Sequence, residues 1–266
     1  MMTIMRRLWR DRWVALVAYS VGSIAMTLLY LATFPAVKDQ AQAMQSLAQS
    51  LPKGLVEAFQ LSNFNPTFDA YFASKHMSAM WPIIVIFLAA SLAGRALAGG
   101  VETGSIGLEL SQPISRFKVF LGKYLGGVLI LTVFIALTVL ATPLFAAPFD
   151  VSSSFTHYWQ LSIVAWLFTM SVYSLAMLAS SIFSERSRVY AVTAAVLIVM
   201  YTAWLIGAIQ DSYAWLKNIS YFNYFDASKI LGKGEISGKG TLIFLLSIAV
   251  FSMLAAWWWQ RRDISV

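Results

Sequence analysis

The chain has 266 residues, of which 59% are hydrophobic and 12% charged, about half the charged fraction of roughly 25% that is typical of soluble domains. So few charges cannot cover a surface that faces water, and the net charge of +7 therefore indicates contact with anionic lipid headgroups rather than with nucleic acid. The absence of cysteine excludes disulfides, thiolate nucleophiles and cysteine metal sites.

Residues 1–13 are predicted to form an amphipathic helix that rests in the membrane interface. Apolar residues fall on one helical face at spacings i, i+4, i+7 and i+8, namely Met1, Met5, Leu8 and Trp9. The opposite face carries Arg6, Arg7 and Arg10, which would contact anionic headgroups. The segment is either a simple topology anchor or a docking element for a cytoplasmic partner.

Six stretches of the chain meet the requirement for a membrane span, which is roughly 20 apolar residues in a helix for a bilayer core about 30 Å thick. They are 13–34, 79–98, 124–147, 159–183, 189–209 and 241–259. Continuous apolar runs of this length are helical, because barrel strands alternate over about 10 residues. The sequence therefore predicts an all-α membrane protein, with residues 1–266 as one transmembrane domain.

Basic residues set the orientation of these spans. With the N-terminus inside, the inner segments hold 12 of the 19 basic residues, including every arginine, whereas the outer segments hold seven lysines on longer loops. This asymmetry predicts that both termini lie in the cytoplasm.

The two larger outer loops, 35–78 and 210–240, carry patterns with more than one interpretation. In the first, an apolar stripe at helical spacing packs on the bundle, lies on the outer leaflet, or forms a vestibule or subunit contact; it comprises Val37, Ala41, Met44, Ala48 and Leu51. In the second, the aromatic residues belong either to the interfacial belt or to short re-entrant helices. His76 and His157 fall near loop ends and are expected to be solvated.

The inner loop 99–118 is the most informative segment. Glycines and the sequence Ser111-Gln112-Pro113 punctuate it. Ser111 suits the N-cap of a short helix and Pro113 its first turn, so a compact cytoplasmic helix tipped with Arg116 and Lys118 is expected. On the residues alone, an ordinary charged loop is an equal alternative.

Groups that power transport or catalysis are not found within the predicted spans. No Asp, Glu, Lys or His lies at mid-membrane depth, although ion-coupled transporters and metal-dependent membrane enzymes rely on such residues. The nearest approach to a phosphate-binding loop is 234–241, whose spacing is wrong and which lies on the predicted outside. Any driven transport is therefore expected to draw its energy from another chain on the cytoplasmic face.

Residues of the inner loop follow one another in a definite order: Glu102, Gly104-Ser105, Leu108, Leu110 and then Ser111-Gln112-Pro113-Ile114-Ser115-Arg116. This order resembles the inner loop of the permeases of ABC-2 type ABC transporters, and the ending Arg262-Asp263-Ile264 is similar to the family's common Arg-Asp-Ile. The likeness covers most of the chain. Thr103 stands where the family often has a basic residue, and Gly107 and Glu109 interrupt a run that is commonly Leu-rich; these departures bear on the detail of partner contact.

The resemblance implies a six-span, type V exporter-like permease fold with an N-terminal interfacial helix and a cytoplasmic coupling helix. It also implies a second permease copy, identical or different, and two copies of a separate ATPase that binds ATP and Mg. This chain would bind no cofactor and would not itself be an enzyme. The residues expected to couple ATP use to the spans are Glu102, Gly104, Ser111, Pro113, Ser115, Arg116 and Lys118.

Substrate would move outward across the cytoplasmic membrane of a prokaryotic cell. Two alternatives stay open at this point. One is an integral membrane enzyme acting on lipids, and the other is a non-transporting membrane scaffold or sensor.

Overall fold

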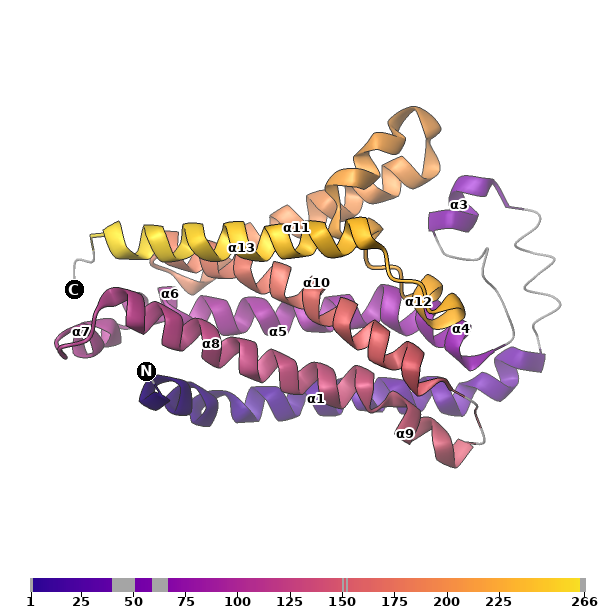
Figure 1. Ribbon diagram of the computed structural model, residues 1–266, viewed down its shortest axis with the longest axis horizontal. Coiled ribbons are helices and arrows are strands. Elements are labelled where there is room, and N and C mark those ends of the chain that lie inside the picture. Colours follow the sequence, from indigo (N-terminus) through magenta and orange to yellow (C-terminus); the bar gives the residue numbers. More distant parts are fainter. Residues whose placement is uncertain (1, 40–50, 59–66, 150, 152, 264–266) are drawn as a thin grey trace.

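The computed structural model describes residues 2–39, 51–58, 67–149, 151 and 153–263, and every regular element within these ranges is helical. Six helical stretches are long and apolar enough to cross a membrane: Met5–Lys38, Phe68–Ala96, Arg116–Phe149, Phe155–Ile182, Arg186–Ile209 and Gly238–Arg261. They run roughly along the long axis of the molecule (Figure 1). The prediction of an all-α fold with six spans is confirmed.

Four spans are single helices: α1 (Met2–Asp39), α10 (Phe155–Ile182), α11 (Arg186–Ile209) and α13 (Gly238–Arg261). The second span combines α4 (Phe68–Phe72), the π-helix η2 (Ala73–Met80) and α5 (Trp81–Ala96). The third combines α8 (Arg116–Ile135), the π-helix η3 (Ala136–Leu140), α9 (Thr142–Ala146) and the 3-10 turn η4 (Ala147–Phe149). The shorter connecting helices are α3 (Lys53–Ala58), α6 (Ala98–Glu102), α7 (Ser105–Leu110), η5 (Asp211–Ile219), η6 (Tyr221–Asn223) and α12 (Ala227–Lys233).

The central helix of the bundle is α10. Of its most apolar 18-residue stretch, 83% is buried inside the protein, against 28% for α11 and 17% for α13. It packs against α13, α5, α11 and α8. The approach of α8 depends on Gly127, because a Cβ at this position would lie 2.1 Å from the hydroxyl oxygen of Tyr173 on α10. The outer helices surround α10 and present apolar side chains on their uncovered faces.

A serine of α10 stabilises the break at which the second span ends. At Leu97, between α5 and α6, the helix is distorted, with φ −113° and ψ −60°. The hydroxyl of Ser180 donates to the carbonyl of Ala93 at 2.6 Å and accepts from the backbone N–H of Ala98 at 3.0 Å. Backbone groups at membrane depth need partners within the protein, so this contact allows the chain to turn into the inner loop.

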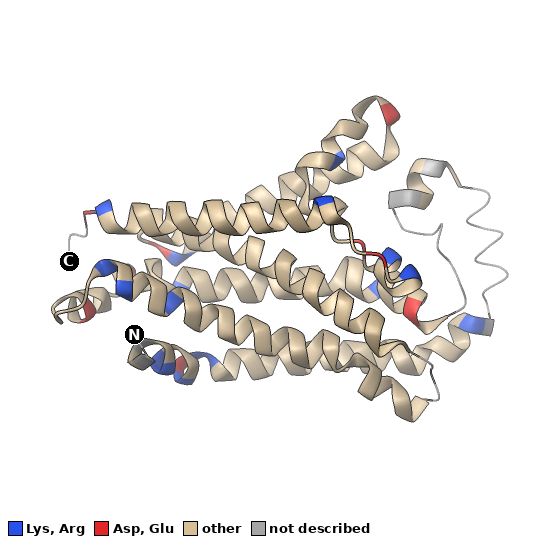
Figure 2. Cartoon of the chain, in the orientation of Figure 1, with Lys and Arg blue, Asp and Glu red and all other residues tan. Residues whose placement is uncertain are grey.

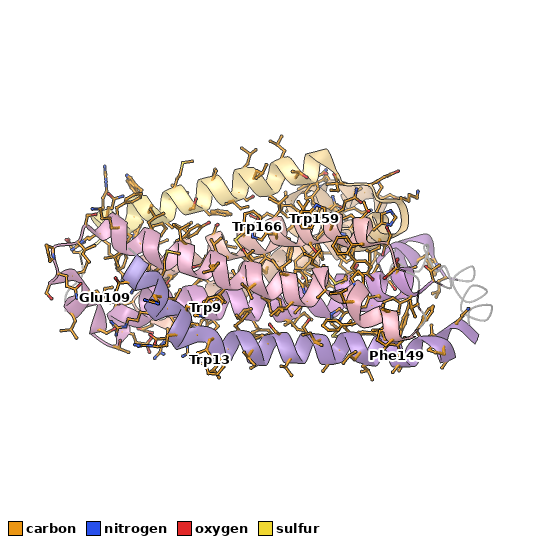
Figure 3. All side chains as sticks on the ribbon, turned by 60° about the horizontal axis from the view of Figure 1, so that its bottom comes forward. Trp9, Trp13, Glu109, Phe149, Trp159 and Trp166 are labelled. Carbon is orange, nitrogen blue, oxygen red and sulfur yellow. The ribbon has the colours of Figure 1, made fainter. Side chains whose placement is uncertain are left out.

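The N-terminal segment is not a separate helix. α1 continues from Met2 to Asp39, because residues 2–21 contain neither Pro nor Gly that would end it. Figure 3 shows the first turns bent away from the axis of the rest of α1 near Trp9 and Trp13. The predicted helix 1–13 is therefore the bent start of the first span.

The boundaries of the outer loops also differ from the prediction. The second span begins at Phe68 rather than at residue 79, because α4 and η2 continue the helix through polar residues that interrupt the apolar run. The aromatic residues of the third outer loop lie in two environments. Tyr213 and Trp215 are exposed on η5, which packs against α11, whereas Tyr221 is buried. The first loop's predicted stripe, at Ala41, Met44 and Ala48, lies outside the described residues, as do Met1 and Ile264.

Candidate functional site

Charged residues gather at the two ends of the bundle and are sparse along its middle (Figure 2). One end holds the start of α1, the helices α6 and α7, and the last turn of α13 (Figure 1). We call it the inner-loop end, and the end that holds α4 and α12 the opposite end. The residues that the sequence predicts to couple lie at the inner-loop end.

The inner loop consists of two short helices joined at a glycine. α6 ends at Glu102, and the Thr103 hydroxyl donates back to the carbonyl of Gly99 at 2.8 Å. Gly104 then has a φ of +69°, in the left-handed region that glycine occupies without steric cost. α7 starts at the next residue, so Gly104 sets the angle between the two helices.

Glu102 ties the inner loop to the start of α11. Its carboxylate accepts from the Arg186 side chain, from Nε at 2.9 Å and from Nη2 at 3.1 Å, and also from the Arg186 backbone N–H at 2.9 Å. Such a bidentate pair is directional, and a carboxylate at a helix start complements the helix dipole. The hydrogen bonds from the Arg186 side chain hold the pKa of Glu102 below its usual value.

Glu109 ties α7 to α8 through an ion pair that the sequence analysis missed. Its carboxylate lies 2.7 Å from the ammonium of Lys123, whose side chain is only 7% exposed. Glu109 had been interpreted only as an interruption of a Leu-rich run. A lysine beside an apolar span needs a partner when it is buried, and this is the signal that could have identified the pair.

The compact helix expected from Ser111 to Lys118 is not where the sequence placed it. The helix of the loop is α7, which ends at Leu110, and 111–115 is a turn. The Ser111 hydroxyl donates to the carbonyl of Leu108 at 3.1 Å, so Ser111 closes a helix instead of starting one. Ser115 is the N-cap of α8, accepting from the N–H of Lys118 at 3.3 Å; the cap was assigned to the wrong serine of the same motif. Pro113 lies within the turn.

Two arginines join the ends of three spans beside the loop. A guanidinium nitrogen of Arg116, at the start of α8, donates to the carbonyl of Arg262, and the Trp259 indole of α13 donates to the carbonyl of Arg116 at 3.2 Å. Arg262 in turn donates to the carbonyls of Ser181 and Phe183 at 3.0 and 2.9 Å. These contacts satisfy the last carbonyls of α10 and hold the ends of α8, α10 and α13 together.

The sequence profile described as ABC-2 family transporter protein matches residues 4–264, which is nearly the whole chain. The chain belongs to the ABC-2 transporter family. The resemblance seen in the inner loop is confirmed, and the bundle of six apolar helices is that of a multi-pass membrane permease. A search of curated proteins finds no match to this permease.

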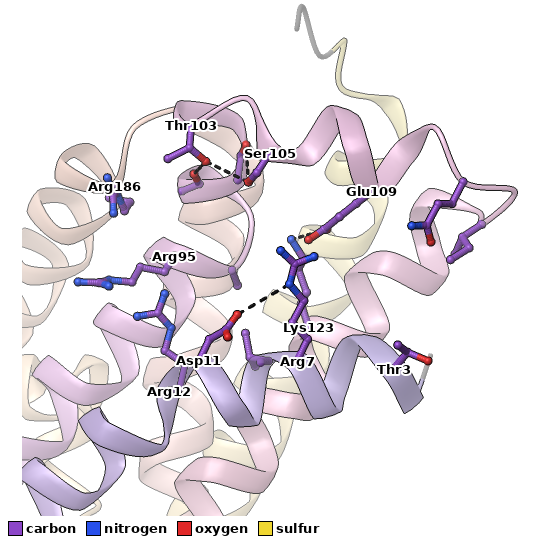
Figure 4. A pocket seen from close by; sticks show the side chains of 16 residues that line it. Thr3, Arg7, Asp11, Arg12, Arg95, Thr103, Ser105, Glu109, Lys123 and Arg186 are labelled. Carbon is purple, nitrogen blue, oxygen red and sulfur yellow. Dashed lines mark hydrogen bonds and ion pairs between the residues drawn. The ribbon is translucent and has the colours of Figure 1, made fainter.

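The permease has a cavity of about 390 Å³ at the inner-loop end, between the start of α1, the end of α5, the inner loop and α8. Figure 4 shows its charged side chains, with Arg7 reaching Asp11 and Lys123 reaching Glu109. The three predicted arginines of the N-terminal segment therefore do not share one location. Arg7 lines this cavity, whereas Arg6 and Arg10 are exposed outside it.

The opposite half of the permease contains a buried histidine, contrary to the expectation of a solvated one. His76 is fully buried in η2 and packs against the rings of Tyr30 and Phe72 at 5.4 and 4.9 Å between centroids. Neither ring nitrogen has a hydrogen-bond partner among the described residues. His157 is half-buried, and its Nδ1 lies 2.9 Å from the carbonyl oxygen of Leu231. Within the described ranges, no group of three or more His, Cys, Asp or Glu is placed to hold a metal ion.

Proposed function

We propose that this permease exports substrate from the cytoplasm, driven by a separate ATPase that binds at the inner-loop end. The observation that carries the proposal is the pair of ion pairs that join the inner loop to the spans. Glu102 joins the loop to α11, and Glu109 joins it to α8. A force applied to α7 would therefore reach two spans through direct contacts.

The surface of α7 suits contact with a partner. Leu108 is 76% exposed and belongs to α7, which lies beyond the ends of the spans (Figure 1). The ion pairs of the loop fix the position of this apolar side chain, so it can fill a pocket on another protein. Full burial of such a side chain stabilises a complex by about 1.5–3 kcal/mol. Of the predicted coupling residues, Glu102, Gly104 and Ser111 would then hold α7 in position, and Pro113, Ser115, Arg116 and Lys118 would form the turn into α8.

ATP would act by favouring one arrangement of the spans. A ligand shifts a conformational equilibrium only by its differential affinity for the two states, so the ATPase must contact the permease differently when ATP and Mg are bound to it. Two ATPase copies and two permease copies, identical or different, would make up the transporter. The largely uncovered apolar faces of α1, α11 and α13 supply surface for lipid and for the second permease copy.

The orientation of the permease follows from its arginines. All ten arginines of the sequence belong to segments at the inner-loop end, and basic residues beside spans favour the cytoplasmic face. We therefore place both termini at the cytoplasmic face of a prokaryotic cell membrane, with export toward the opposite end.

The variant Leu108→Asp tests the proposal. Because Leu108 is exposed, the variant should leave the fold intact while reducing the amount of ATPase that copurifies with the full-length permease by at least tenfold, which corresponds to about 1.4 kcal/mol. ATP hydrolysis by the purified complex should fall in parallel. Leu108→Met keeps an apolar side chain of similar size and should behave like the wild type. Full copurification and hydrolysis with Leu108→Asp would contradict the proposal.

A further inference from the structure

The cavity at the inner-loop end has more positive than negative charge on its walls. Its lining includes two carboxylates, Asp11 and Glu109, and five cations: Arg7, Arg12, Arg95, Lys123 and Arg186. Its volume falls in the range of roughly 300–1,000 Å³ that is usual for small-molecule sites. The excess of cations indicates that the cavity suits an anion.

Three of the five cations are neutralised by carboxylates. Lys123 pairs with Glu109 at 2.7 Å, Arg186 with Glu102 at 2.9 Å, and Arg7 with Asp11 at 3.9 Å. Arg12 and Arg95 make no ion pair within the part of the chain that the structure describes. The uncompensated charge is thus confined to two guanidinium groups.

These two guanidinium groups belong to different helices and lie beside each other. Figure 4 shows Arg12 from α1 next to Arg95 from the last turn of α5, and neighbouring like charges repel each other. The Nε of Arg12 is buried and has no hydrogen-bond partner among the described residues. A buried donor without a partner costs about 1–3 kcal/mol, and an anion between the two arginines would remove both that cost and the repulsion.

We propose that Arg12 and Arg95 bind a phosphate group in this cavity. Guanidinium groups present a planar fork of donors that matches the oxygens of phosphate, with two parallel hydrogen bonds from each side chain. The phosphate can come from an anionic phospholipid headgroup, since both arginines lie near the ends of membrane spans, where headgroups lie. It can also come from a free phosphate compound that enters the cavity. This inference does not depend on the ATPase or on the direction of transport.

The experiment compares two probes on the purified full-length permease. In the first arm, the permease is placed in nanodiscs of phosphatidylcholine with a tenth of phosphatidylglycerol, and the lipids that stay bound are identified by native mass spectrometry. In the second arm, inorganic phosphate is titrated into the permease in neutral detergent, and thermal stability is recorded. The test variants are Arg12→Gln/Arg95→Gln and, for the exposed side chain alone, Arg95→Gln. The matched control is Arg188→Gln, which removes an exposed arginine at the inner-loop end outside the cavity.

The wild type and Arg188→Gln should bind at least one probe saturably, and the double variant should bind it at least tenfold more weakly. Arg95→Gln alone should also weaken binding, which keeps the test valid if the double variant misfolds. Retention of phosphatidylglycerol without a response to inorganic phosphate assigns the site to a lipid headgroup, and the reverse assigns it to a free phosphate compound. Equal binding by the wild type and Arg95→Gln, an equal loss in Arg188→Gln, or no saturable binding of either probe would overturn the proposal.

Discussion

The two ends of the permease are held together by different forces. At the inner-loop end, ion pairs and arginine–carbonyl contacts join segments that are far apart in sequence, such as Glu102 with Arg186 on α11. At the opposite end, aromatic rings pack between α1 and the second span, with Phe34 against Phe68 at 5.6 Å and Tyr30 against Tyr71 at 5.6 Å. Ion pairs near water, such as Glu102 with Arg186, can exchange partners at a small cost, whereas a packed core resists displacement.

This difference indicates where a partner can act on the permease. A protein that binds at the inner-loop end meets charged groups and an exposed leucine whose contacts it can replace. A force at the opposite end meets closely packed aromatic rings, which resist displacement. We infer that the inner-loop end receives the mechanical input and that the aromatic rings of α1 and the second span hold the opposite ends of these two spans together.

The largest expected effect comes from breaking the buried ion pair at the inner-loop end. Glu109→Gln leaves the ammonium of Lys123 buried without its carboxylate, which should lower the free energy of unfolding by about 3 kcal/mol, measured by denaturation in mixed micelles. The double variant Lys123→Met/Glu109→Leu removes both charges and should restore most of that loss. An equally unstable double variant would mean that the charges themselves are not what stabilises the contact.

A smaller effect is expected from a hydrogen bond that lies beside the aromatic rings of the opposite end. The Tyr158 hydroxyl of α10 donates to Asp69 of α4 at 2.9 Å, and Tyr158 is fully buried. Tyr158→Phe should lower the free energy of unfolding by about 1.5–3 kcal/mol, the range for hydrogen bonds to charged groups. In an Asp69→Asn background the same change should cost less. A cost that is the same in both backgrounds would show that packing, and not the hydrogen bond, is lost.

The smallest effect, and the only gain, is expected at His76. Because neither of its ring nitrogens has a partner among the described residues, His76→Phe keeps a ring against Tyr30 and Phe72 and removes the unpaired polar atoms. The free energy of unfolding should rise by about 1 kcal/mol, measured in the same micelles. A loss of stability would indicate that the imidazole makes a polar contact, such as one to a bound water molecule.

The six spans could be predicted from the sequence because the length of each apolar run determines them. The ion pairs and hydrogen bonds between the inner loop and the spans could not be predicted. Residue spacing alone does not show that Glu109 meets Lys123, since the turn 111–115 determines how α7 folds back on α8. Likewise, the motif Ser111-Gln112-Pro113-Ile114-Ser115 contains two possible caps, and the choice of Ser115 depends on where α7 ends. His76 was misplaced because hydropathy treats it as a loop residue, whereas the π-helix η2 places it among aromatic rings.

The orientation of the two ends can be measured directly because the sequence lacks cysteine, so a single introduced cysteine is the only labelled site. Arg188→Cys places it at an exposed position at the inner-loop end, and Lys233→Cys at an exposed position in α12 at the opposite end. With a membrane-impermeant maleimide, the account predicts that Lys233→Cys is labelled in intact cells and that Arg188→Cys is labelled only after the membrane is opened. Labelling of Arg188→Cys in intact cells, with Lys233→Cys protected, would contradict it.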